Sequence, residues 1–142
     1  MSDLEIAKST LENEAATLVV VKDGRIIFKT NASGMRGLLQ AIEALNHDIC
    51  GASIADSIVG RAAALLLAHA KVKDAYAAIL SEGGLKILEA NGIKYEFGRI
   101  VPWILNRSQT DLCPFEKLSL SIESPGEAYE KLREFEESMS RY

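Results

Sequence analysis

The stretch that decides the fold is residues 17–30, TLVVVKDGRIIFKT. Two runs rich in β-branched residues, TLVVVK at 17–22 and RIIFKT at 25–30, flank the dipeptide Asp23-Gly24. An Asp-Gly connection favours a type I′ turn, because both of its central positions need a positive φ angle. The segment therefore predicts an antiparallel β-hairpin near the start of the chain.

Helices are predicted on both sides of this hairpin. Before it, Ser2 and Glu5 fit a capping box, and apolar residues at helical spacing predict a helix over 3–14. After it, Ser33 is a candidate N-cap for a second helix. The apolar face of that helix would consist of Met35, Leu38, Leu39, Ile42 and Leu45.

A long central helix is predicted over residues 54–70. Ser53 and Asp56 fit a capping box in which Asp replaces the usual Glu. The sequence AALLLAHA at 63–70 is apolar nearly all round, and such a helix lies in the centre of a domain. His69 is then expected to be a core histidine.

Strands and helices alternate in the second half of the chain. The pattern predicts a strand over 74–80 (DAYAAIL), a helix that follows the turn 81–84 (SEGG) and ends at Gly92, and a half-exposed strand over 93–101. An antiparallel hairpin followed by βα units implies a mixed sheet with helices on both faces. The predicted architecture is a three-layer α/β/α sandwich that forms a single domain over residues 1–142.

Two short C-terminal helices complete the prediction. Residues 102–112 begin extended and become a polar loop, after which Pro114 occupies a favoured first helical position behind Cys113. Ser124 is expected to cap the last helix. That helix is expected to bury Ala128, Leu132, Phe135 and Met139.

The composition is that of a globular domain. The chain has 142 residues, of which 48% are hydrophobic and 25% charged. No apolar run approaches the ~20 residues of a membrane span, and the first ten residues lack the apolar core of a secretory signal. A net charge of −4 argues against binding to duplex nucleic acid. Two cysteines are too few for a disulfide scaffold, so we expect a cytoplasmic protein with reduced thiols.

The order of elements and four segments resemble an uncharacterised family of domains of unknown function that has a cytidine-deaminase-like fold. The segments are DSIVGRAAALL at 56–66, NGIKYEF at 91–97, VPWILNR at 101–107 and DLCPFE at 111–116. The resemblance extends over nearly the whole chain. It implies a cytidine-deaminase-like α/β/α fold with a pocket at the N-terminal end of the central helix.

The catalytic residues of a zinc deaminase are missing. The resemblance implies a His or Cys followed by a Glu at the start of the central helix, and two cysteines at the start of the next helix. This sequence has SIVGRA at 57–62 and SEGG at 81–84. The loose grouping of His47 and Cys50 with Cys113 has a spacing that arises by chance. We therefore expect no metal, no cofactor and no zinc-dependent deaminase activity.

Polar residues near the implied pocket are candidates for binding. Arg61 is either an anion anchor at a helix N-terminus or a surface partner for Asp56. Asn106 and Arg107 offer amide and guanidinium recognition, or else form a solvated turn. Cys113 is either a reactive thiol or a small cap, and Glu116 opposes a low thiol pKa. The predicted ligand-binding set is Asp56, Ser57, Gly60, Arg61, Asn106, Arg107, Cys113 and Glu116.

Three hypotheses for function follow. We favour a non-catalytic module, a pseudo-deaminase, that binds a small anionic or nucleotide-like ligand with these residues. The second hypothesis is an enzyme that uses Cys113 as nucleophile or sulfur carrier, assisted by Asp111 or Glu116. The third is a homodimer or other homo-oligomeric interaction protein, with the apolar stripe over 35–45 as its interface.

Overall fold

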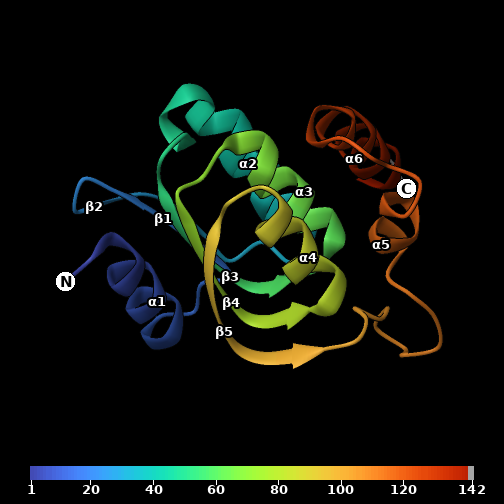
Figure 1. Cartoon of the computed structure of the whole chain (residues 1–142), viewed down its shortest axis with the longest axis horizontal. Coiled ribbons are helices and arrows are strands. Elements are labelled where there is room, and N and C mark those ends of the chain that lie inside the picture. The colour runs from blue at the N-terminus through green and yellow to red at the C-terminus, as the bar shows by residue number, and fades with distance from the viewer. Residues whose placement is uncertain (141–142) are drawn as a thin grey trace.

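Within residues 1–140, the part of the chain that the computed structural model describes, five strands form one mixed sheet in the order β2-β1-β3-β4-β5. β1 (Leu18–Lys22) pairs antiparallel with both β2 (Arg25–Thr30) and β3 (Ser53–Val59). β4 (Asp74–Ser81) and β5 (Lys94–Val101) continue the sheet parallel to β3. The arrowheads of β3, β4 and β5 point toward the side of the molecule where α5 lies (Figure 1).

The predicted hairpin is confirmed at its turn. Asp23 and Gly24 have φ angles of 52° and 77°, the positive pair that a type I′ turn requires. The Gly24 N–H also donates a hydrogen bond of 2.9 Å to Asp3 Oδ1, which joins the turn to the first helix. In that helix, α1 (Asp3–Asn13), the predicted capping box of Ser2 and Glu5 is present.

Helices cover both faces of the sheet (Figure 1). α1 packs on one face over a small core that includes Leu4, Leu11 and Tyr76. The other face is covered by α2 (Met35–Leu45), α3 (Arg61–Ala70) and α4 (Glu82–Ala90), and α2 is followed by the 3₁₀ turn η1 (Asn46–Ile49). The last two helices, α5 (Pro114–Ser119) and α6 (Pro125–Ser140), pack against α3. The three-layer α/β/α sandwich with a mixed sheet is thus confirmed.

The predicted central helix is wrong in its first part. Ser53–Val59 is the strand β3, and α3 begins at Arg61, directly after Gly60. A strand enclosed between two neighbours and covered on both faces needs no regular alternation of apolar and polar residues. The apolar residues of β3 and α3 therefore form one continuous pattern in the sequence, which predicts a single helix. Asp56 therefore belongs to a strand and not to a capping box, and Arg61 is the first residue of its helix.

Three smaller predictions also need correction. Gly34, with a φ angle of 66°, is the N-cap of α2 in place of Ser33, and no side chain bonds to that helix end. Met139 is 46% exposed, although Ala128 and Leu132 of α6 are buried as predicted. The apolar stripe of α2 packs into the core through Leu38, Leu39 and Ile42, so these side chains do not form the exposed interface that the sequence predicts.

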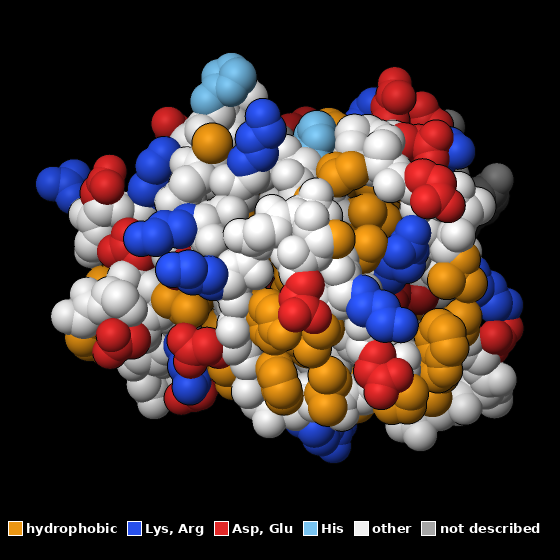
Figure 2. All heavy atoms as spheres, viewed as in Figure 1, with side chains coloured by type: hydrophobic (Ala, Val, Ile, Leu, Met, Phe, Trp, Pro, Cys, Tyr) orange, Lys and Arg blue, Asp and Glu red, His pale blue; other side chains and the backbone are white. Residues whose placement is uncertain are grey.

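β5 is the exposed edge of the sheet. Tyr95 packs partly against the larger core, whereas Phe97 and Ile100 are 42% and 41% exposed. Hydrophobic side chains gather over the region of α4 and β5, and again near α5 and the loop before it (Figure 2). In residues 1–140, no helix combines the length and the apolar character that crossing a bilayer requires.

Candidate functional site

A cavity of about 700 Å³ opens at the carboxyl end of β3. Its wall combines the end of β3, the first turn of α3, the N-terminus of α2, the loop after β5, the N-terminus of α5 and the C-terminal part of α6. Most of the lining is apolar: Met35, Leu38, Ile58, Ala63, Ile104, Leu105, Pro114, Phe115 and Met139. Volume and lining are typical of sites for small organic ligands.

The cavity gathers seven of the eight predicted binding residues: Asp56, Ser57, Gly60, Asn106, Arg107, Cys113 and Glu116. They come from three separate segments, which the parallel strands and the return of the chain along α5 bring to one end of the sheet. Arg61 does not line the cavity. The sequence analysis missed the contributions of Arg36 on α2 and Glu136 on α6, because nothing local links these distant helices.

Asp56 reaches the cavity because of the register of β3. Its Cα pairs with that of Leu18 on β1. Leu18 and Ile54, which lies two residues before Asp56, belong to the larger core under α2 and α3. Side chains two residues apart share one face of a strand, so Asp56 projects to that side. On that side of the sheet, Asp56 lines the cavity together with the buried side chains of Leu38 and Ala63.

The Asp56 carboxyl group receives its hydrogen bonds from the backbone. Its Oδ1 accepts a hydrogen bond of 3.3 Å from the Ile58 N–H, and no cationic side chain within residues 1–140 pairs with it. Burial raises the pKa of Asp56 to about 7, against the opposing effect of the backbone N–H groups of Ile58 and Ser57. Such a carboxyl group gains from a ligand that supplies N–H donors.

Glu116 fills the N-terminal end of α3. Its two carboxylate oxygens accept hydrogen bonds from the backbone N–H groups of Arg61 (2.9 Å) and Ala62 (2.8 Å). The carboxylate lies where a Cβ atom on residue 60 would stand, so Gly60 is required there. Burial raises the pKa of Glu116, and the hydrogen bonds from Ala62 and Arg61 oppose that rise. An internal carboxylate thus occupies the position that favours anions at this helix end.

Arg61 holds the C-terminal end of α5. Its Nε donates to the Ser119 carbonyl oxygen (3.1 Å), and its Nη2 donates to the Ile122 carbonyl oxygen (2.7 Å). These bonds satisfy backbone acceptors that the end of a helix leaves open. Because the guanidinium is engaged away from the cavity, we leave Arg61 out of the proposed site.

The loop after β5 is shaped by Asn106 and leaves Arg107 available. Asn106 Oδ1 accepts from the Thr110 N–H (3.0 Å), and an isolated β-bridge joins Leu105 to Leu112. Arg107 is exposed on the rim of the cavity, and no acidic group within the described residues 1–140 pairs with it. Its guanidinium is therefore free to bind an anionic group at the mouth.

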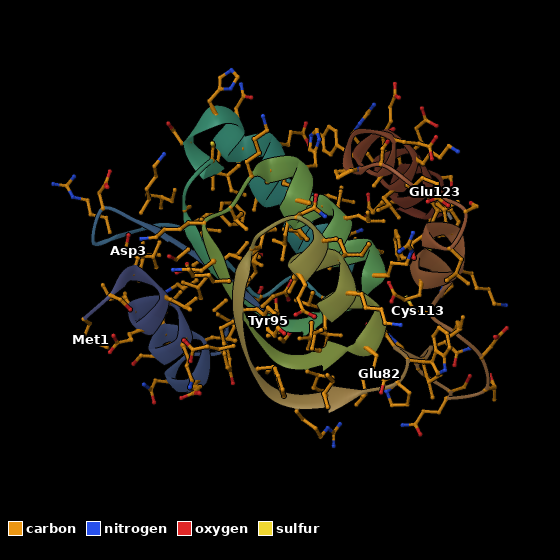
Figure 3. All side chains as sticks on the ribbon, viewed as in Figure 1. Met1, Asp3, Glu82, Tyr95, Cys113 and Glu123 are labelled. Carbon is orange, nitrogen blue, oxygen red and sulfur yellow. The ribbon has the colours of Figure 1, made fainter. Side chains whose placement is uncertain are left out.

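Cys113 stands at the start of α5, directly before Pro114, as the sequence predicts (Figure 3). It is half-buried, it lines the cavity, and its N–H donates to the Ile104 carbonyl oxygen (3.0 Å). His47 and Cys50 lie at η1 and its end, and neither lines the cavity. Within residues 1–140, no three His, Cys, Asp or Glu side chains group as metal ligands would.

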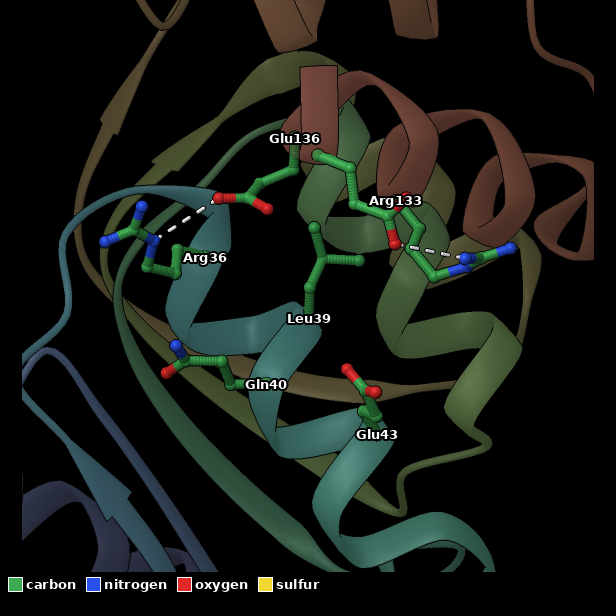
Figure 4. Close-up of a pocket in the computed structure, with 7 residues that line it drawn as sticks. Arg36, Leu39, Gln40, Glu43, Arg133 and Glu136 are labelled. Atoms are coloured by element: carbon green, nitrogen blue, oxygen red, sulfur yellow. Dashed lines mark hydrogen bonds and ion pairs between the residues drawn. The ribbon is translucent and has the colours of Figure 1, made fainter. Parts of the chain in front are cut away.

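A smaller cavity of about 220 Å³ lies between α2 and α6 and shares Arg36 and Glu136 with the first (Figure 4). Arg36 Nε donates to Glu136 Oε1 across 3.3 Å, and Arg133 pairs with Glu137 at 3.2 Å. The Arg36–Glu136 pair therefore bridges the two helices where both cavities meet. Exposed pairs of this kind contribute little stability, so a ligand can compete for Arg36.

Comparison with solved structures gives a match over nearly the whole chain. The crystal structure of a DUF1893 family protein from Thermotoga maritima aligns with a TM-score of 0.83 and 26% identity, and the match covers 99% of this chain and 90% of that one. Acinetobacter baumannii RibD aligns with a TM-score of 0.49 and 25% identity over 68% of this chain and 33% of RibD. A diaminohydroxyphosphoribosylaminopyrimidine deaminase/reductase from Thermotoga maritima aligns with a TM-score of 0.48 and 18% identity, over 81% of this chain and 38% of that one.

Sequence comparison places the chain more directly. No curated protein matches it. A family model described as a domain of unknown function, DUF1893, matches residues 6–136, which includes every strand of the sheet and nearly all of the cavity wall. Since the match spans most of the sequence and agrees with the structural alignment, this chain belongs to the DUF1893 family.

Proposed function

We propose that the cavity at the carboxyl end of β3 binds a small nucleotide-like molecule, and that the chain acts as a binding module without zinc chemistry. The observation that carries this proposal is the cavity itself. It combines apolar walls with the carboxyl group of Asp56 and, at the rim, the guanidinium group of Arg107, and neither group forms an ion pair within residues 1–140.

The chemistry of a nucleotide suits this combination. A heterocyclic base is planar and largely apolar on its faces, and the lining side chains Leu38, Ile58 and Phe115 can exclude water from it. The N–H groups on the edge of a base are donors for Asp56. A phosphate group at the other end of the molecule can accept two N–H bonds from Arg107. The sequence predicts an anion site that includes Arg61, Asn106 and Arg107, and the proposal keeps Arg107 and leaves Arg61 out.

A charge reversal at the rim tests the proposal. Calorimetry and thermal shift with nucleosides and their monophosphates should find ligands that bind the purified chain. Arg107→Glu should weaken a monophosphate about tenfold and leave the matching nucleoside within about twofold, because only the phosphate contacts the rim. Arg99→Glu, on exposed β5 away from the cavity, is the matched control. If no nucleoside or nucleotide binds, the proposal is wrong.

An enzyme that uses Cys113 is the second candidate. The observation in its favour is that the thiol lines the same cavity as Asp56 and Glu116, so a bound molecule would contact it. Iodoacetamide labelling of Cys113 as a function of pH is the test, with the exposed Cys50 as an internal reference. Labelling of Cys113 no faster than that of Cys50 near neutral pH would remove this candidate.

Both thiols are free, in keeping with the cytoplasmic location that we infer.

A further inference from the structure

We infer that Asp56 selects the ligand by its base, and that the preferred base presents two adjacent N–H donors on one edge, as guanine does. This inference rests on the proposed function, since it concerns the same cavity. It adds the chemical class of the ligand and names the side chain that discriminates among bases.

The first step is the hydrogen-bonding capacity of the Asp56 carboxylate. An ionised carboxylate has two oxygens with about four acceptor positions. Within residues 1–140, Oδ1 accepts a long hydrogen bond of 3.3 Å from the Ile58 N–H, the Ser57 N–H adds a further backbone contribution, and no side chain donates to the carboxylate. The group therefore retains the acceptors for two parallel N–H bonds from a ligand, the bidentate geometry that carboxylates favour.

The second step is the environment of that carboxylate. Leu38 and Ala63, which are 2% and 3% exposed, line the cavity on the same side of the sheet. In such surroundings a polar group without a hydrogen-bond partner raises the free energy more than it would in water. A ligand that donates a hydrogen bond to it is therefore bound more strongly. A base that offers acceptor atoms to Asp56 is repelled, and a base that offers two donors is favoured.

The other charged groups at the cavity already have partners or lie at its rim. Glu116 of α5 is already bonded to the α3 N-terminus, and Arg36 of α2 faces Glu136 of α6. Arg107 stands at the rim of the loop after β5. None of these side chains pairs with Asp56 within residues 1–140, so the donors must come from the ligand.

A comparison of three nucleosides tests the inference. Guanosine offers a ring N–H and an amino group side by side, inosine has the ring N–H without the amino group, and adenosine has an acceptor beside its amino group. The wild-type chain should bind guanosine at least about tenfold more tightly than inosine, since each lost donor leaves a buried acceptor unpaired. Adenosine should bind more weakly than guanosine by a similar factor.

Asp56→Asn should abolish this preference. The Asn side chain presents one oxygen acceptor and one NH₂ donor where the carboxylate presents two oxygens, so the amino group of guanosine loses its partner. The guanosine-to-inosine ratio should fall to about one, and a merely structural role of Asp56 would not change that ratio. Asp74→Asn, on neighbouring β4 and outside the cavity, should keep the wild-type ratio.

The pH dependence supplies a second readout. Two N–H bonds require the ionised carboxylate, and burial raises the pKa of free Asp56 to about 7. Guanosine affinity should therefore fall by up to about tenfold per pH unit below that value, and Asp56→Asn should remove the dependence.

The outcomes separate the two proposals. If nucleosides bind in the cavity but guanosine has no advantage, or Asp56→Asn keeps the advantage, this inference is wrong and the proposed function stands. If no nucleoside or nucleotide binds, both are wrong.

Discussion

Asp56 and Glu116 are both carboxyl groups withdrawn from water at one cavity, yet their surroundings differ. Glu116 receives two backbone N–H bonds at the start of α3, so its position is explained by the fold. Asp56 receives only backbone N–H bonds, the one from Ile58 being long at 3.3 Å, and no opposite charge within residues 1–140. A buried group that the fold leaves uncompensated lowers stability and points to a role in binding.

This difference predicts the pH dependence of stability. The pKa of Asp56 is about 7 in the folded chain, against a value of 3.8 for an unperturbed Asp in the unfolded chain. Between these two pH values the folded state holds a proton that the unfolded state lacks. Stability contributed by Asp56 is therefore lost as the pH rises toward 7. Asp56→Asn should become more stable relative to wild type by about 2 kcal/mol from about pH 5.5 to about pH 8. Urea unfolding at both pH values measures this, and a constant difference would contradict it.

Gly60 leaves the space that the Glu116 carboxylate occupies. A Cβ at this position would overlap the Glu116 carboxylate, which would have to leave both of its N–H donors. Gly60→Ala should lower the free energy of unfolding by about 2–4 kcal/mol. Gly83→Ala, in α4, is the matched control, because its Cβ would lie 3.6 Å from Cβ of Arg61 on α3, an ordinary van der Waals contact, and Ala is favoured over Gly in a helix. Equal stability of the two variants would show that Glu116 does not need this space.

At the scale of elements, α3 and α5 are joined by reciprocal caps. Glu116 of α5 bonds to the first N–H groups of α3, and Arg61 of α3 bonds to the last carbonyl groups around α5. A six-residue helix such as α5 has little stability alone. This pair of contacts therefore fixes the wall of the cavity that carries Cys113.

Loss of the Arg61 guanidinium should lower the stability of the chain without changing its affinity for the ligand. Arg61→Ala should cost about 2 kcal/mol in unfolding free energy, because two charge-assisted bonds are lost. Affinity for the ligand, measured by calorimetry on the folded fraction, should stay within about twofold. Arg36→Ala, which breaks only an exposed ion pair, should cost less than about 1 kcal/mol. A large loss of affinity without a loss of stability would return Arg61 to the binding site.

The elements also differ in how well the sequence predicts them. The hairpin depends on two adjacent residues, Asp23 and Gly24, whose backbone preference is local. β3 depends on neighbours supplied by distant parts of the chain, so its residues showed no strand pattern of their own. The candidate site shows the same contrast between local and long-range signals. Cys113 before Pro114 is a local signal, whereas the acceptors of Arg61 are backbone carbonyls that no side-chain pattern marks.

At the scale of the whole molecule, the cavity connects parts of the chain that are otherwise separate. Its wall takes residues from the start of α2, the end of β3, the segment from Ile104 to Glu116, and the end of α6. The β1–β2 hairpin and α1 contribute nothing to the wall. A ligand in the cavity therefore adds contacts between the sheet and the C-terminal helices, and leaves the opposite layer of the sandwich unchanged.

This arrangement predicts where ligand binding slows hydrogen exchange. With guanosine at about 100 times its dissociation constant, the bound state is stabilised by about 2.7 kcal/mol, so amides that exchange through opening of the cavity should slow by about 100-fold. The slowing should fall on residues 104–119 and on the end of α6, because their packing closes the cavity. Amides of the β1–β2 turn serve as the internal reference and should not change, since they lie outside the wall. Mass-spectrometric exchange on wild type and Asp56→Asn measures both regions. Protection confined to the hairpin would place the ligand somewhere other than this cavity. Equal protection of the variant at the same guanosine concentration would show that Asp56 does not contribute to binding.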